Sequence, residues 1–391
     1  MRLRLQVLHL VIGDMNNYFK TLRTQLGTLW GKVRDKAAHR LQRFRPREPD
    51  AQVPIATLLS RTDVEVPHHD IGEDFRHTLL AAAERRVNPD YSPLGNTHEL
   101  SSAMGLYFLS QARDYLVYTP PGYRLDEALP VVVVLHGCKQ THLEIRANSG
   151  FDEIADRERF IVVYPFVTRY FGLRNLNCWG WWQRYHIRAG TGEVEDLHRI
   201  IEQVQQEFTV DEARIHIVGL SSGAAMSVAA LVAHGRLFAS GASVAGVAYG
   251  ESARAVRIHP LLSVKYRSIT ATVARMKHQL VGKGRLAPLL VIQSQNDQTV
   301  ELQSGLNLRD SWLRVKGVSK QRPEPLVQRT QGIEWQYRQY QQEQQPTPLE
   351  TLLVEQVKHG WVGGNSGKYS DSRGPNISEI IWLFFKRHPR L

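Results

Sequence analysis

The chain has 391 residues and an ordinary globular composition, with 42% hydrophobic and 22% charged residues. This length favours one large domain with an appendage, and no apolar run reaches the roughly 18 residues that a membrane-spanning helix needs. The two cysteines, Cys138 and Cys178, are too few for a disulfide scaffold or a cysteine zinc site. We therefore expect no metal ion and no cofactor.

The net charge of +11 is concentrated at the amino terminus. Residues 1–50 carry eleven Lys and Arg against four Asp and Glu, a net charge of +7. Within residues 1–47, apolar side chains recur at three- and four-residue spacings among basic ones, which predicts a basic amphipathic helical arm. Such an arm suits an apolar or anionic surface, but its stripe could equally pack on the rest of the chain or pair with a second copy. We expect no nucleic-acid partner, and the oligomeric state stays open.

In the remainder of the chain, the pattern of polar and apolar residues changes once. Residues 48–106 are mixed and polar, and we interpret them as a linker with short helices. From residue 107 to residue 391, strand and helix patterns alternate, which predicts the α/β class. The expected fold is a mostly parallel, doubly wound sheet with an amino-terminal helical extension. The expected strands cover residues 115–118, 131–135, 160–164, 215–218, 289–293, 334–340 and 351–355, and the expected helices cover residues 194–208, 224–232 and 377–385.

The stretch Gly219-Leu-Ser-Ser-Gly223 lies between a short apolar strand and a run of small residues. The pattern G-x-S-x-G occurs by chance in many proteins, so a flexible loop is the alternative interpretation. A strand that turns directly into a helix would instead strain the backbone of Ser221 and present its hydroxyl at the carboxyl edge of the sheet. Glycines on both sides let the strand and the helix approach each other. The context therefore predicts that Ser221 is a nucleophile.

A serine nucleophile needs an imidazole to take its proton and a carboxylate to orient that imidazole. Asp297 follows the strand at 289–293, and His359 follows the strand at 351–355. By itself the aspartate could cap a turn and the histidine could be structural. Three suitable residue types after three predicted strands, in the order Ser, acid, His of the α/β hydrolases, predict a catalytic triad.

An oxyanion hole requires two hydrogen-bond donors beside the nucleophile. The backbone N–H of Ser222, at the start of the helix, is one candidate. The second is expected from the loop Leu135-His-Gly-Cys-Lys-Gln140 after an early strand, with the N–H of Cys138 as the donor. We expect His136 to order this loop rather than to transfer protons.

Five motifs, LHGCKQ, NCWGWW, GLSSGAAM, QSQNDQTV and HGWVGG, follow one another along residues 107–385. With this order and spacing, the sequence resembles the poly(3-hydroxybutyrate) depolymerase family of esterases. The resemblance implies the α/β-hydrolase fold, with Ser221 as nucleophile, Asp297 and His359 as its relay and Cys138 as an oxyanion donor.

The resemblance also suggests substrate contacts. It places Trp179, Trp181 and Trp182 beside the substrate cleft, and we add Trp361 of the HGWVGG motif as a further substrate-binding candidate. At least one of the clustered tryptophans should be exposed, because they cannot all face inward on one short loop. Since both cysteines lie at the cleft by motif, we expect their sulfurs to be neighbours; whether they form a disulfide stays open.

The expected function is a serine esterase that hydrolyses poly(3-hydroxybutyrate) or a related short-chain polyhydroxyalkanoate through an acyl-enzyme. The alternatives are a carbohydrate acyl esterase of the feruloyl or acetylxylan type, or a surface-binding protein with a vestigial hydrolase. No polymer-binding module or Ser/Thr-rich linker is apparent, so the chain is most similar to the intracellular short-chain-length type. We expect a cytoplasmic location, on polyester granules through the arm, rather than a periplasmic or secreted one.

Overall fold

The computed structural model describes residues 71–390 except 168–175, 258–262, 282–284, 319–322 and 343–344. All of these lie in the second of two compact units, which covers residues 67–391. The arm predicted over residues 1–47 lies outside the described residues. In the part of the chain that the structure describes, no helix is long and apolar enough to cross a membrane.

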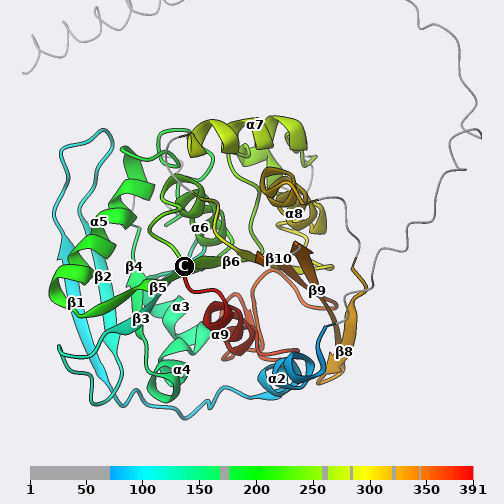
Figure 1. Ribbon diagram of the computed structural model, residues 1–391, viewed down its shortest axis with the longest axis horizontal. Helices are drawn as coiled ribbons and strands as arrows, with labels where there is room; N and C mark the ends of the chain where they lie inside the picture. The colour runs from blue at the N-terminus through cyan, green and yellow to red at the C-terminus, as the bar shows by residue number, and fades with distance from the viewer. Residues whose placement is uncertain are drawn as a thin grey trace, which may run out of the picture. The chain divides into compact units, whose positions relative to one another are not determined.

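A single large sheet runs through this unit, with the strand order β1-β2-β4-β3-β5-β6-β7-β10-β9-β8 (Figure 1). The strands from β4 to β10 in that order are parallel. At each side of the sheet, the two outermost strands run antiparallel to their neighbours: β1 and β2 at one side, β9 and β8 at the other. The mostly parallel sheet expected from the sequence is thus confirmed. The strands of the sheet are β1 (Asn96–Ser102), β2 (Arg113–Thr119), β3 (Leu129–Leu135), β4 (Ile161–Pro165), β5 (Val210–Leu220), β6 (Ser240–Val244), β7 (Leu289–Ser294), β8 (Leu326–Thr330), β9 (Ile333–Gln342) and β10 (Gln345–Val354). Two short strands, β11 (Trp361–Val362) and β12 (Ser370–Asp371), pair separately.

Helices cover both faces of the sheet (Figure 1). The layer of α5, α6, α7 and α8 packs on one face, and the layer of α2, α3, α4 and α9 packs on the other. Strand β3 shows the consequence, because all of its residues are buried and alternate ones enter opposite cores. The helices are α2 (Glu73–Glu84), α3 (His142–Ser149), α4 (Phe151–Glu158), α5 (Gly192–Glu207), α6 (Ser222–Ala233), α7 (Ile269–Leu280), α8 (Leu302–Lys316) and α9 (Ile377–Arg387), and a short 3-10 helix, η3, spans Ala253–Ala255.

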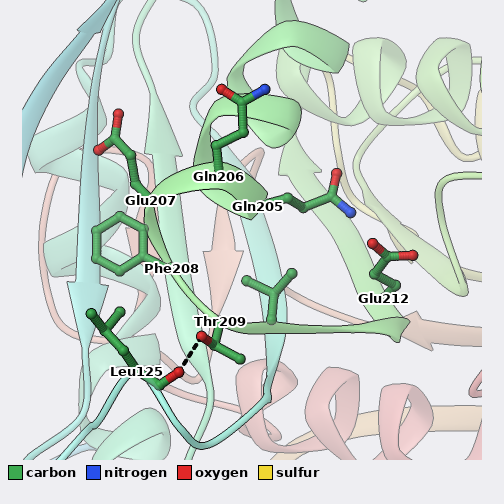
Figure 2. Close-up of a pocket in the computed structure, with 8 residues that line it drawn as sticks. Leu125, Gln205, Gln206, Glu207, Phe208, Thr209 and Glu212 are labelled. Carbon is green, nitrogen blue, oxygen red and sulfur yellow. Dashed lines mark hydrogen bonds between the residues drawn. The ribbon is translucent and has the colours of Figure 1, made fainter.

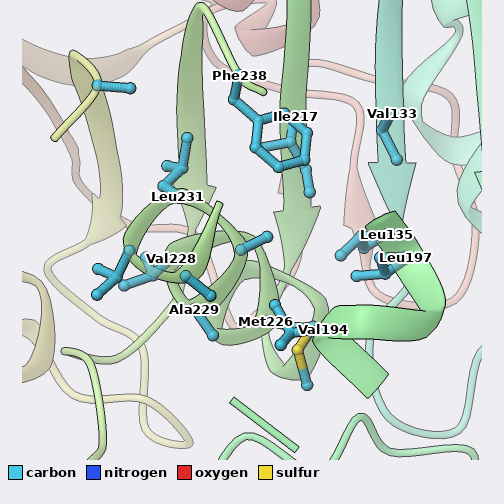
Figure 3. Close-up of a cluster of buried hydrophobic side chains, with 14 of the residues drawn as sticks. Val133, Leu135, Val194, Leu197, Ile217, Met226, Val228, Ala229, Leu231 and Phe238 are labelled. Carbon is cyan, nitrogen blue, oxygen red and sulfur yellow. The ribbon is translucent and has the colours of Figure 1, made fainter. Parts of the chain in front are cut away.

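Helix α6 lies at the centre of its layer. Its sequence SGAAMSVAALVA is buried at every position, which explains why it is apolar all round rather than amphipathic. Figure 3 shows Met226 and Leu231 of this helix in the same core cluster as Ile217 of β5 and Val194 of α5. The strand before Ser221 and the helix after it are therefore both held by packing.

The domain boundary predicted at residue 107 is wrong for the described part of 48–106. Strand β1 pairs with β2 along its whole length. Helix α2 is joined to the start of α9, because the N–H of Asn376 donates to the carbonyl of Ala83 (3.0 Å). These elements belong to the same unit as the rest of the sheet. The prediction failed because β1, NTHELSS, is a half-exposed edge strand in which Thr97 is the one β-branched residue, with no Val, Ile, Phe, Tyr or Trp to mark it as a strand.

Elsewhere, the predicted strands and helices are confirmed with small shifts of their ends. The largest shift is in β10, which begins at Gln345 rather than at residue 351.

Candidate active site

Ser221 lies at a sharp turn between β5 and α6. Its φ of 57° and ψ of −114° lie in a region that is rarely occupied by residues other than glycine and costs about 1–3 kcal/mol. The turn is held because the N–H of Ser221 donates to the carbonyl of Val244 on neighbouring β6 (2.9 Å) and its carbonyl accepts from the N–H of Ala225 (3.0 Å). The elbow predicted from the sequence is therefore present.

The glycines on either side of the elbow are required by close approach. A Cβ added to Gly219 would lie 2.4 Å from the carbonyl carbon of Gly223, and one added to Gly223 would lie 2.4 Å from the carbonyl oxygen of Leu135. No side chain fits at such distances. The strand, the helix and the end of β3 are thereby packed tightly around Ser221.

Asp297 and His359 are in direct contact. Strands β7 and β10 are hydrogen-bonded neighbours, so the loops after them meet at one place on the sheet edge. There, Nδ1 of His359 lies 2.7 Å from Oδ2 of Asp297. The aspartate side chain is fully buried, and its Oδ1 accepts the N–H groups of Thr299 (2.8 Å) and Val300 (2.9 Å).

This contact sets the tautomer of the imidazole. A carboxylate accepts hydrogen bonds, so Nδ1 of His359 is the donor to Asp297, and in the neutral imidazole the lone pair is on Nε2. The histidine side chain is 13% exposed, so it lies at the surface of the site rather than in the core. Nε2 is therefore the atom that can take a proton from a nucleophile.

The acid loop and the histidine loop are also joined by polar contacts that the sequence did not predict. The hydroxyl of Ser294 donates to the carbonyl of Val357 (2.5 Å), and the side chain of Asn296 accepts the N–H of Gln356 (2.8 Å). The polar run Ser294–Asn296 at the end of a buried strand is the feature of the sequence that could have indicated these contacts. Its side chains fix one loop against the other and so fix the Asp297–His359 distance.

The loop after β3 passes next to the nucleophile. A Cβ added to Gly137 would lie 3.4 Å from the Cβ of Ser221, so the backbone that leads into Cys138 is in contact range of the serine. Ser222, the next residue along the chain, is in the first turn of α6, where backbone N–H groups have no acceptor within the helix. The loop that contains Cys138 and the first residue of α6 are thus both next to Ser221, and the two N–H groups stay the predicted oxyanion donors.

Three links join the oxyanion loop to the tryptophan loop. Cys138 and Cys178 form a disulfide with a Cα–Cα distance of 4.3 Å, which confirms that they are neighbours. The N–H of Lys139 donates to the carbonyl of Leu176 (2.6 Å), and the side-chain amide of Asn177 donates to the carbonyl of Gln140 (3.3 Å). The oxyanion loop is therefore held from outside as well as by its own turn.

His136 is a structural residue, as expected. It is fully buried, and burial lowers the pKa of its imidazole to about 4, so the ring is neutral near pH 7. Its Nδ1 donates to the carbonyl of Gly137 (2.8 Å) and its Nε2 accepts the N–H of Val167 (3.2 Å). Both ring nitrogens are occupied by the backbone that they order.

Two of the four tryptophans predicted to bind substrate do not line a cleft. Trp179 and Trp361 are both 0% exposed. The indole N–H of Trp179 donates to the carbonyl of His136 (3.1 Å), and that of Trp361 donates to the hydroxyl of Ser378 (2.9 Å). They were assigned wrongly because a motif does not reveal which ring has a buried partner for its N–H. Trp179 instead fixes the oxyanion loop.

Trp181 and Trp182 remain the candidates for a substrate wall. Their rings meet edge to face at 5.4 Å, and Trp182 is partly exposed. They belong to a small apolar cluster with Ala225 on the first turns of α6 and Val300 beside the acid. This places apolar surface next to the elbow and the acid loop.

A hollow in the surface lies away from this site. It has a volume of about 370 Å³ and lies between the end of α5 and the start of β5, lined by residues such as Phe208 and Glu212 (Figure 2). The hollow lies at the amino end of β5, whereas Ser221 follows its carboxyl end. Among the described residues, no group of three or more His, Cys, Asp or Glu side chains could hold a metal ion.

The disulfide should stabilise the unit. Closing a loop over a sequence separation of 40 residues restricts the unfolded chain by about 4 kcal/mol. We expect the double variant Cys138→Ser/Cys178→Ser to lose that much free energy of unfolding in urea titrations, and reduced wild type to match it. Equal unfolding midpoints with and without reductant would contradict this expectation.

A strained serine elbow, a buried Asp–His pair and a fixed backbone loop beside the serine define a serine hydrolase of the α/β-hydrolase fold. A family model described as esterase PHB depolymerase matches residues 113–320. The chain belongs to this family.

Individual relatives agree with this membership. The chain is 32% identical over 120 residues to poly(3-hydroxyalkanoate) depolymerase C of Paucimonas lemoignei, covering 31% of this chain and 28% of that protein. It is 27% identical over 146 residues to feruloyl esterase B of Neurospora crassa, covering 37% and 48% of the two. The fold is similar to that of an acetyl xylan esterase from Aspergillus awamori, with a TM-score of 0.52 and 18% identity over 68% of this chain and 94% of that one. The chain thus matches less than half of the length of these two curated relatives.

Proposed function

We propose that the chain is a serine carboxylic ester hydrolase that cleaves poly(3-hydroxybutyrate) or a related short-chain polyhydroxyalkanoate. The observation that carries the proposal is the Asp297–His359 pair, 2.7 Å apart and at the same sheet edge as the elbow of Ser221. In the proposed reaction, the Ser221 hydroxyl oxygen attacks the ester carbonyl carbon while Nε2 of His359 accepts the hydroxyl proton.

The remaining steps follow the same groups. The negative oxygen of the tetrahedral intermediate is held by the N–H groups of Cys138 and Ser222. Its collapse breaks the ester bond, and His359 returns the proton to the departing alcohol oxygen, leaving an acyl-serine. Water, deprotonated by the same imidazole, then attacks the acyl carbon, releasing the carboxylic acid and restoring the Ser221 hydroxyl.

An apolar loop supports a polyester over a sugar ester as the substrate. Residues 103–109, Ala-Met-Gly-Leu-Tyr-Phe-Leu, follow β1 and contain no charged side chain. Met104 is 67%, Leu106 108% and Phe108 60% exposed. Because β1 ends where β2 begins, and β2 runs antiparallel to β4, this loop leaves the sheet at the same edge as Ser221.

The loop holds these side chains outward through its own anchors. The hydroxyl of Tyr107 donates to buried Asp196 (2.7 Å), and the carbonyl of Phe108 accepts the N–H of Gly192 (2.9 Å). The ring of Phe108 then packs edge to face on Tyr185. An uncharged polyester offers methyl and methylene groups to such a surface, whereas an acylated xylan offers mainly hydroxyl groups.

The test compares a solid polymer with a soluble ester. We expect Leu106→Ser/Phe108→Ser to slow hydrolysis of amorphous poly(3-hydroxybutyrate) particles by about tenfold, since each large apolar contact is worth roughly 1.5–3 kcal/mol when fully buried. Hydrolysis of p-nitrophenyl butyrate should stay within about twofold. The matched control is Leu125→Ser, which removes a 67%-exposed leucine at the hollow on the opposite sheet edge. Equal loss on both substrates, or no loss on either, would remove this support for the polyester.

A carbohydrate acyl esterase is the second candidate, because the matches to the feruloyl esterase and the acetyl xylan esterase favour it. It predicts faster hydrolysis of feruloyl or acetyl sugars than of poly(3-hydroxybutyrate). Measuring kcat/KM on the three substrates with one preparation decides between the candidates.

The compartment and the surface-anchoring arm are separate proposals. We propose a cytoplasmic enzyme that associates with polyester granules through the basic amphipathic arm predicted over residues 1–47, and in that compartment Cys138 and Cys178 would be kept reduced. Alkylation of the two thiols in intact cells tests this, because cytoplasmic protein should be labelled at both positions.

A further inference from the structure

Gln140 holds the turn that carries the oxyanion donor. Its side chain is fully buried, and its Oε1 accepts the N–H of Gly137 at 2.8 Å. The backbone N–H of Gln140 donates to the carbonyl of Gly137 at 3.3 Å. One residue therefore closes the four-residue turn on both sides of Gly137, and Cys138 lies within that turn.

The turn needs such a support. Lys139, between the donor and Gln140, has a φ of 61°, which is unfavourable for a residue with a side chain. The turn also lies against the nucleophile, because a Cβ placed on Gly137 would be 3.1 Å from Oε1 of Gln140 and 3.4 Å from the Cβ of Ser221. A shift of the carboxamide would thus move the backbone next to the reacting serine.

Part of the carboxamide is unsatisfied. Nε2 of Gln140 is buried without a hydrogen-bond partner in the described part of the chain. Leaving a buried donor unpaired costs about 1–3 kcal/mol, so packing alone gives no reason to keep a glutamine here. The one strong bond that the side chain makes is the bond to Gly137.

We propose that Gln140 is a positioning residue that sets the N–H of Cys138 for the oxyanion of the transition state. The proposal rests on the proposed esterase function. The side chain does not touch the substrate, since it is fully buried; it acts through the backbone of Gly137. It must also be neutral, because a carboxylate at this position would repel the negative oxygen that the loop stabilises.

The first test is Gln140→Ala. Loss of one oxyanion donor lowers kcat by about 10²–10³-fold, so a displaced donor should lower kcat by about 10- to 100-fold with KM within about twofold. The Ki for a trifluoromethyl ketone, which forms a hemiketal oxyanion on Ser221, should rise by the same factor as kcat/KM falls. A Ki unchanged beside a lowered kcat, or a kcat within threefold of wild type, overturns the proposal.

The second test, Gln140→Glu, remains informative if the alanine variant does not fold. The protonated acid can still accept from the N–H of Gly137, and burial raises the pKa of a carboxyl group. The ratio of variant to wild-type kcat should therefore be highest at low pH and fall as pH rises through that pKa, when the carboxylate forms. A ratio independent of pH would mean that the residue only supports the fold.

The matched control is Gln279→Ala, a buried glutamine on α7 outside the oxyanion loop whose Nε2 is likewise unpaired. It should leave kcat and Ki within about twofold of wild type. Failure of the two proposals is distinguishable. If wild type hydrolyses no ester, the esterase proposal and this one fall together, whereas an active wild type with unaffected Gln140 variants refutes only the positioning role.

Discussion

Replacing Ser221 with alanine should abolish ester hydrolysis and leave the fold intact. No other group in the site can form the acyl-enzyme, so kcat should fall by roughly 10⁶-fold, as when a serine protease loses its nucleophile. The elbow should survive, because it is held by the backbone bond from Ser221 to Val244 and by the packing of α6, neither of which involves the hydroxyl. Initial rates with p-nitrophenyl butyrate, together with circular dichroism, measure both expectations.

The control for this variant is Ser227→Ala on the same helix. Ser227 is buried, whereas Ser221 is partly exposed, and the hydroxyl of Ser227 donates to the carbonyl of Gly223 (3.0 Å). This variant should keep most of the wild-type rate. Retention of more than a few per cent of activity in pure Ser221→Ala protein would remove Ser221 from the mechanism.

The chemistry of this site could be predicted from the sequence because it depends on the order of strands and loops. Buried parallel strands are apolar runs that are easily recognised, and their carboxyl ends must meet at one edge. Ser221, Asp297 and His359 each follow such a strand, so their proximity follows from topology. The contact between the acid and the histidine is the part of this expectation that the structure confirms directly.

What could not be predicted depends on side-chain direction and on weakly patterned edges. In the sequence, Trp179 and Trp361 cannot be distinguished from tryptophans of an exposed substrate surface, but in the structure each indole N–H has a buried acceptor. The polar strand β1 gains its stability from pairing with β2, which a local pattern does not report. The support of the oxyanion turn by Gln140 likewise depends on a three-dimensional contact.

Asp297→Asn should be the next most damaging substitution, although it changes the shape of the side chain very little. The amide oxygen can still accept the N–H groups of Thr299 and Val300, so the loop should keep its conformation. The amide nitrogen then faces Nδ1 of His359 and, as a donor, requires Nδ1 to be the unprotonated nitrogen. The proton moves to Nε2, where it blocks acceptance of the serine proton.

We therefore expect kcat for p-nitrophenyl butyrate to fall by roughly 10⁴-fold, with little change in the unfolding midpoint. Asp310→Asn and Asp371→Asn are the matched controls, since these carboxylates pair with Arg309 (2.7 Å) and Arg373 (2.8 Å) rather than with His359. Both controls should retain near wild-type rates. A mild effect at Asp297 with a steep one at Asp371 would make Asp371 of β12 the acid instead, and the buried Asp297–His359 contact would then serve the fold only.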